Sequence, residues 1–317
     1  MISQSNPLRG VRVVSLAINL PGPLAAARLS ALGATVTKVE PPSGDPLRSA
    51  APAWYEELTA GQRVETRDLK RAEDRALIEG ELASADLLLT STRPSALAKL
   101  GLDDLGERFP RLSHVEIVGH DGAAAEMPGH DLTYQAVYGT LQPPALPTVP
   151  VADLLGAERA VSAALVALRI AATTGAGHRE RVVLDRAAAD AGAAARHGLT
   201  GAGAPLGGGH PGYRVYATAD GYIALAALEP HFWERARAAL GGAETREEFE
   251  RTFLTRSTGE WEQLAAQHDI PLAGVRSAVP GPLGSSPAAP PAPPAQATPA
   301  AQATPPAPTA PLHTEKQ

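Results

Sequence analysis

Two short motifs in the middle of the sequence carry acid–base side chains at the predicted starts of helices. The first is Gly129-His130-Asp131, and the second is Val151-Ala152-Asp153, which follows a proline-rich linker. Imidazole and carboxyl groups can exchange protons near neutral pH when their surroundings tune them. The structural alternative is simpler: Asp131 and Asp153 would cap helices, and His130 would be a solvated side chain. Taken alone, the motifs favour that structural interpretation.

Two further segments could contribute to a site. Gly207-Gly-Gly-His210-Pro-Gly212 is a glycine-rich run, and Leu228-Glu229-Pro230 lies between a predicted strand and a predicted helix. A glycine run is by default a flexible connector. Glu229 could equally be an ordinary surface residue at the start of a helix.

Several classes of chemistry are excluded by what the sequence lacks. It contains no cysteine, which rules out disulfides, thiolate nucleophiles and cysteine-ligated metals. It has no Gly-x-Gly-x-x-Gly after the first predicted strand, no phosphate-binding Walker motif and no Gly-x-Ser-x-Gly elbow. No pair of His or carboxylate residues has strong metal spacing, so we predict no metal site.

The first half of the chain alternates predicted strands and helices. The strands are expected at 11–17, 35–39, 86–89 and 113–118, and the helices at 23–32, 74–84 and 95–100. This order predicts an α/β fold with a doubly wound parallel sheet. Ligands of such sheets bind at the carboxyl ends of the strands.

The rest of the chain predicts helices and a small antiparallel element. Helices are expected at 132–141, 154–173, 231–240, 246–254 and 260–267, with strands at 181–184, 213–218 and 222–226. Ala219-Asp220-Gly221 is a plausible hairpin turn between the last two strands. We therefore expect an α/β domain over 7–200, a smaller α+β domain over 201–279, and a disordered Pro/Ala-rich tail over 280–317.

Composition narrows the partners and the compartment. The 317 residues are 44% hydrophobic and 20% charged, with a net charge of −6. A net negative charge argues against a nucleic-acid partner, because nucleic-acid-binding proteins usually present a concentrated basic surface. The first residues do not read as a secretory signal, and no apolar stretch has the ~20 residues needed to span a bilayer. We therefore expect a cytoplasmic protein without a membrane partner.

At several points the sequence resembles class III CoA-transferases of the CaiB/BaiF type. The amino-terminal match is Pro7-Leu-Arg-Gly-Val-Arg-Val-Val, followed by Leu20-Pro-Gly-Pro-Leu and Leu32-Gly-Ala-Thr-Val-Thr-Lys-Val-Glu. Gly129-His-Asp-Leu-Thr-Tyr-Gln and Val151-Ala-Asp-Leu-Leu-Gly match the family's central block. Thr218-Ala-Asp-Gly-Tyr and Leu228-Glu-Pro-His-Phe are most similar to the α-methylacyl-CoA racemase branch.

The resemblance implies an enzyme that uses a coenzyme A thioester as substrate, with no permanently bound cofactor. It implies an interlocked homodimer and a catalytic aspartate, which maps onto Asp153. In racemase members a His and an Asp face the substrate α-carbon from opposite sides, and these map onto His130 and Asp153. Supporting carboxylates map onto Asp131 and Glu229. Backbone amides at the start of the Asp153 helix could hold an enolate.

The resemblance also suggests where coenzyme A binds. Basic side chains that could contact its phosphates are Lys70, Arg93 and Lys99, and backbone near Leu20 and Pro21 could line the pantetheine. Ser91 and His120 are further candidate positions. One departure is that Gly156-Ala-Glu158 replaces the glycine pair usual after the catalytic aspartate, so that Glu158 could intrude there.

Three functions remain in view. The first is α-proton transfer, that is epimerisation, on a 2-methylacyl-CoA, which His130 and Glu229 favour. The second is CoA transfer between carboxylic acids through an Asp153 anhydride. The third is a non-catalytic CoA-binding homologue, suggested by a proline-rich segment where the resemblance predicts further folded chain.

Overall fold

The computed structural model describes residues 6–276, which form two compact units with the boundary after His210. Each unit has its own hydrophobic core. The predicted tail over 280–317 lies outside the described residues. None of the described helices is both long and apolar enough to cross a bilayer.

The first unit is built on a six-stranded sheet in the order β3-β2-β1-β4-β5-β6, and every neighbouring pair is parallel. The strands are β1 (Arg12–Ser15), β2 (Thr35–Glu40), β3 (Arg63–Thr66), β4 (Leu87–Thr90), β5 (Ser113–Val118) and β6 (Arg179–Val183). The predicted parallel α/β sheet is therefore confirmed. Strand β3 was not predicted, because its exposed, charged residues give no apolar run.

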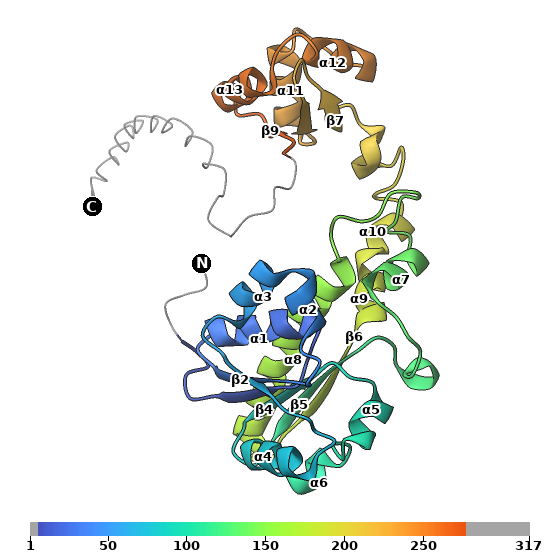
Figure 1. Cartoon of the computed structure of the whole chain (residues 1–317). Helices are drawn as coiled ribbons and strands as arrows, with labels where there is room; N and C mark the ends of the chain where they lie inside the picture. Colours follow the sequence, from blue (N-terminus) through green and yellow to red (C-terminus); the bar gives the residue numbers. More distant parts are fainter. Residues whose placement is uncertain (1–5, 277–317) are drawn as a thin grey trace, which may run out of the picture. The chain divides into compact units, whose positions relative to one another are not determined.

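Helices cover both faces of this sheet (Figure 1). Successive strand residues point to opposite faces: Val13 packs into one core cluster and Val14 into the other. One face is covered by α1 (Pro21–Ala31), α3 (Pro52–Thr59) and α8 (Val151–Thr174), and the other by α4 (Ala72–Leu82), α5 (Pro94–Lys99) and α6 (Leu105–Arg108). Burial on both faces explains why the central strand β4 is a nearly continuous apolar run.

The remaining helices of the first unit are short. They are α2 (Pro46–Ala50), α7 (Asp131–Val137), α9 (Leu184–Ala191) and α10 (Ala193–Arg196), with helical turns at Gly122–Ala124 and Pro205–Gly209. Helix α7 ends earlier than the sequence pattern predicts, and Gly139 follows it in the left-handed region at φ 74°. Leu184 begins α9 rather than ending the preceding strand.

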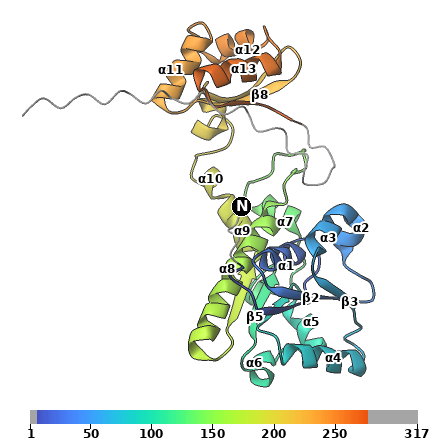
Figure 2. The same cartoon turned by 90° about the vertical axis from the view of Figure 1, so that its left-hand side faces the viewer.

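The second unit is a three-stranded antiparallel sheet with helices packed on one face (Figure 2). Strands β7 (Tyr213–Ala217) and β8 (Tyr222–Ala226) form the predicted hairpin, and β9 (Leu272–Gly274) pairs with β8. The helices are α11 (Pro230–Ala239), α12 (Arg246–Phe253) and α13 (Thr258–His268). The core is rich in aromatic rings, with Phe253 in contact with both Tyr216 and Trp261.

Candidate active site

The carboxyl ends of β1 and β4 meet where the strand order reverses, which is the usual ligand position in such sheets. Ser91 joins the two ends: its Oγ accepts the Ile18 N–H at 2.9 Å and lies 3.1 Å from the Ile18 carbonyl oxygen. The loop after β1 then turns at Asn19, whose φ is 67°. This turn leads directly into Leu20, Pro21 and the start of α1.

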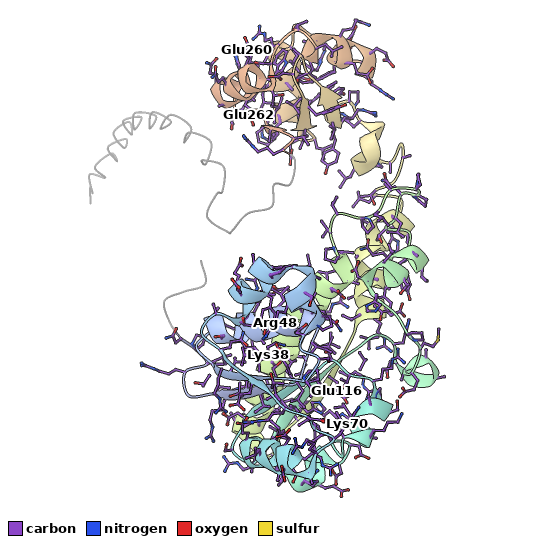
Figure 3. The ribbon with its side chains drawn as sticks, viewed as in Figure 1. Lys38, Arg48, Lys70, Glu116, Glu260 and Glu262 are labelled. Carbon is purple, nitrogen blue, oxygen red and sulfur yellow. The ribbon has the colours of Figure 1, made fainter. Side chains whose placement is uncertain are left out.

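A buried ion pair holds that turn in place. Asp45 accepts the Asn19 N–H at 3.0 Å, and its other oxygen accepts from Lys38 Nζ at 2.7 Å. Lys38 Nζ also donates to the Ala17 carbonyl at 3.0 Å. Lys38, labelled in Figure 3, and Asp45 are both fully buried as side chains. The sequence did not predict this pair, because nothing in the residues around Lys38 distinguishes a buried lysine in a strand from an exposed one.

Asp131 and Asp153 come together at the start of α8. Asp131 Oδ1 accepts the backbone N–H of Ala152 at 2.7 Å and that of Asp153 at 3.2 Å. Neither aspartate is the N-cap of its own helix: His130 precedes α7, and Pro150 precedes α8. Asp131 instead caps α8 from the neighbouring helix. The amides expected to hold an enolate are therefore already occupied by this carboxylate.

A pocket of about 220 Å³ brings five of the eleven predicted site residues together. Asp153, His130, Arg93, Ser91 and Pro21 all line it. Its other walls come from the ends of β1, β4 and β5, the loop before α7, and the residues Tyr134 and Leu184. Parallel-strand topology thus gathers at one sheet edge residues that are far apart in the sequence.

The Asp153 carboxyl is poised for proton exchange. Burial, followed by the negative charge of Asp131, raises the pKa of Asp153 from 3.8 to about 7. Desolvation disfavours the carboxylate, and a neighbouring anion disfavours it further. A carboxyl group with a pKa near neutrality can both accept and donate a proton at physiological pH, which suits a general acid–base.

Tyr134 is a wall of the pocket that sequence reasoning did not single out. A Cβ added at Gly119 would lie 2.3 Å from the Tyr134 hydroxyl oxygen, and one at Gly129 would lie 2.4 Å from its ring. The phenol is thus packed against two glycines, and the His120 ring meets it edge-on at 5.2 Å. Burial, with a smaller effect from Asp153, raises the pKa of Tyr134 to about 12, so that the hydroxyl stays protonated.

A second, larger pocket of about 540 Å³ lies beyond the carboxyl ends of β2 and β4. It is lined by Lys70, which Figure 3 labels, together with Lys99 and Arg67. Thr92 lines both pockets, so the segment after β4 is shared between them. The remaining walls are mainly apolar, with Leu69, Leu97 and Leu100 among them.

His120 and Leu20 are not among the residues that line the Asp153 pocket. His120 Nδ1 is 3.7 Å from Asp185 Oδ2, behind the Tyr134 ring. Leu20 packs against the main core. Glu158 is exposed and pairs with Arg28 at 3.1 Å, while Gly156 packs against Leu184, so Glu158 does not intrude. Glu229 is an exposed residue in the second unit, where it precedes α11.

Characterised relatives include both CoA-transferases and racemases. Succinate–glutarate CoA-transferase from Agrobacterium fabrum is 34% identical over 71% of this chain and 64% of its own length. Cinnamoyl-CoA:phenyllactate CoA-transferase from Clostridium sporogenes is 29% identical over 86% and 79%. The α-methylacyl-CoA racemase of Homo sapiens is 28% identical over 81% and 74%.

Solved structures match the architecture described above. A hypothetical protein from Mycobacterium tuberculosis superposes with a TM-score of 0.75 at 25% identity, covering 86% of both chains. A CAIB/BAIF family protein from Brucella suis superposes with a TM-score of 0.72 at 25% identity, covering 86% of this chain and 85% of its own. The sequence model of CoA-transferase family III matches residues 8–279. The resemblance seen in the sequence is thereby confirmed, and the chain belongs to CoA-transferase family III.

Proposed function

We propose that this enzyme exchanges the α-proton of a 2-methylacyl-CoA thioester, with Asp153 and His130 as the two acid–base groups. The observation that carries the proposal is their shared pocket, in which the pKa of Asp153 is raised to about 7. The α-proton of a thioester is weakly acidic, so its removal needs a base that is unprotonated yet strong enough near pH 7. Epimerisation also needs an acid on the opposite side of the α-carbon.

The two groups that line this pocket differ in their exposure to solvent. His130 is exposed at the end of the loop before α7, whereas Asp153 is partly buried in the first turn of α8. In one direction Asp153 takes the α-proton and His130 delivers a proton to the other face; in the reverse direction the roles exchange. The Tyr134 hydroxyl, held protonated, is available as a hydrogen-bond donor in the same pocket.

The larger pocket is suited to the coenzyme A moiety. Lys70 and Lys99 line it and would contact phosphates, while its apolar walls would contact adenine. Arg93 lines the smaller pocket next to Thr92, which the two pockets share, and Pro21 lines the same pocket, where pantetheine would lie. Glu229 would support one of the acid–base groups, and the protein would act as a homodimer, as the resemblance implies.

Deuterium exchange tests the proposal directly. The protein is incubated with 2-methylacyl-CoA in deuterated water, and incorporation at the α-carbon is followed by mass spectrometry. Exchange is expected for the wild type and is expected to fall at least about 100-fold in Asp153→Asn, which keeps the size of the side chain but removes the base. Absence of exchange with coenzyme A binding intact would contradict the proposal.

A second candidate, CoA transfer between carboxylic acids, is favoured by the 34% and 29% identities to two CoA-transferases. This reaction needs only Asp153. Its carboxylate attacks the thioester carbonyl, the C–S bond breaks, and CoA leaves as the thiolate. The acyl group remains on Asp153 as a mixed anhydride. Hydroxylamine during turnover would trap this anhydride as an Asp153 hydroxamate. Turnover without a hydroxamate, and without movement of labelled acid into thioester, would remove this candidate.

A further inference from the structure

Gln135 is a buried polar residue beside the site, and neither acid–base chemistry nor the CoA pockets account for it. It lies one turn after Asp131 on α7 and is 2% exposed. Its amide Nε2 donates to Asp131 Oδ2 at 2.5 Å and to the Val149 carbonyl at 3.1 Å. Its Oε1 accepts from the Thr140 hydroxyl at 3.1 Å. A buried amide with partners for both ends is costly to disturb.

These partners allow only one orientation of the amide group. An ionised Asp131 and the Val149 carbonyl can only accept, so both must face the NH₂ group rather than the oxygen. In that orientation the Thr140 hydroxyl can donate to Oε1 at 3.1 Å or to the Gln135 backbone carbonyl at 3.2 Å. The Gln135 NH₂ group therefore faces Asp131 and donates to its carboxylate.

With Gln135 in place, both oxygens of Asp131 are hydrogen-bonded. Oδ1 accepts the two amides of the first turn of α8, and Oδ2 accepts Gln135 Nε2. Three donors therefore hold a carboxylate that is only 9% exposed. Asp131 and Gln135 together join three segments: α7, which carries both, the linker that contains Val149, and the start of α8.

We propose that Gln135 is a positioning residue of the active site: it clamps Asp131 between α7 and the linker, and Asp131 in turn fixes the first turn of α8 that carries Asp153. The clamp also determines where the negative charge next to Asp153 lies. The role of Asp153 itself rests on the proposed function, but the clamp does not.

The surroundings of Asp153 define what the clamp should change. Helix α7 contributes Asp131 and Tyr134, and the pocket lining adds His130 at the start of α7 and Arg93 after β4. Of these, Asp131 is the group that raises the pKa of Asp153, in addition to burial. If Asp131 loses its Gln135 donor, its carboxylate is held less firmly beside the first turn of α8, and its contribution to the raised pKa of Asp153 decreases.

The test is a titration of Asp153 itself. The protein is labelled with aspartate carrying ¹³C at the carboxyl carbon, and the Asp153 signal is assigned by its loss in Asp153→Asn. In Gln135→Leu the Asp153 midpoint is expected to fall by about half a pH unit or more. Gln62→Leu is the matched control. The Gln62 amide also donates to a carbonyl, that of Leu58 at 2.7 Å, but Gln62 does not contact the site.

A second variant keeps the test decisive if Gln135→Leu does not fold. Thr140→Val retains the Gln135 amide but removes the hydroxyl that orients it, so a smaller shift in the same direction is expected. An Asp153 midpoint that is unchanged in the folded variants, or that changes equally in Gln62→Leu, overturns the proposal. Because the titration needs no turnover, a wild type that fails to exchange deuterium contradicts the proposed function and leaves this inference standing.

Discussion

At the scale of single residues, Asp153 shows how position gives an ordinary carboxyl unusual chemistry. Its pKa is raised by burial and by Asp131, and Asp131 is in turn hydrogen-bonded by the helix that carries Asp153. The folded protein therefore holds the Asp153 proton more tightly than the unfolded chain does. As pH rises, more of Asp153 becomes the carboxylate that can act as a base, while the free energy of unfolding decreases.

The first prediction concerns stability. Because the pKa of Asp153 is raised from 3.8 to about 7 on folding, the free energy of unfolding falls as pH rises between those values. Asp153→Asn removes this loss, so it should be more stable than the wild type by roughly 1–3 kcal/mol at pH 8 and by much less at pH 4. Urea unfolding at the two pH values measures this. Asp103→Asn, at an exposed position, is the control and should show no such pH-dependent gain.

The second prediction concerns the pH dependence of catalysis. In the proposed function, each enantiomer of the substrate would present its α-proton to a different one of the two acid–base groups. For the enantiomer deprotonated by Asp153, the single-turnover exchange rate should rise with pH through about 7, because the carboxylate is the base. For the opposite enantiomer, Asp153 must donate, so the Asp153-dependent step should slow with pH over the same range. Identical profiles for the two enantiomers would contradict the assignment.

At the scale of elements, short turns rather than long helices define the site. Gly119 and Gly129 leave room for the Tyr134 ring, and the left-handed Asn19 leads the chain from β1 into α1. The long helix α8 packs into the main core, but its amino-terminal end is capped by Asp131 from α7. Changes in these turns should therefore alter the pocket more than changes within helices.

The third prediction uses two glycines with different surroundings. Gly129→Ala would place a Cβ 2.4 Å from the Tyr134 ring, so we expect a loss of about 1–3 kcal/mol in the free energy of unfolding and weaker acyl-CoA binding. Gly80 lies within α4 and has nothing within 4 Å of the added Cβ. Gly80→Ala should therefore raise stability by up to about 1 kcal/mol. Chemical unfolding measures the stability change of both variants, and calorimetric titration with an acyl-CoA measures the binding change.

The fourth prediction concerns the ion pair under the β1 turn. Lys38→Met leaves Asp45 as an unpaired buried carboxylate and should cost about 3–5 kcal/mol, with loss of coenzyme A binding as the Asn19 turn relaxes. Arg71 pairs with Glu73 at an exposed position, so Arg71→Met should cost less than about 1 kcal/mol. Equal destabilisation by the two substitutions would mean that Lys38 does not hold the turn.

At the scale of the whole molecule, the chain divides into two units with separate cores. The first unit contains the pocket around Asp153, and the second contains Glu229. A fifth prediction follows from the separate cores. Phe253→Ala removes a fully buried ring from the second core and should cost that unit about 3–5 kcal/mol. In hydrogen exchange, peptides within 211–276 should lose protection while those from β1, β4 and β5 keep it.

The sequence by itself determined the class of fold and the residues that could react. Alternating apolar strands and helices are local patterns, so the parallel sheet and most helix positions followed from them, and the motif around Asp153 identified the family. Strand β3 escaped, because its mostly exposed residues form no apolar run. Helices α2, α3 and α9 were also missed, and α9 begins at Leu184, which the sequence pattern assigned to the preceding strand.

Only the tertiary structure decided what those residues do to one another. The capping of α8 by Asp131, the packing of Tyr134 against Gly119, and the Gln135 clamp join residues from separate segments. The raised pKa of Asp153 depends on burial and on a charge 22 positions away in the sequence. Burial, desolvation and long-range hydrogen bonding arise when the chain folds, and no local pattern of residues encodes them.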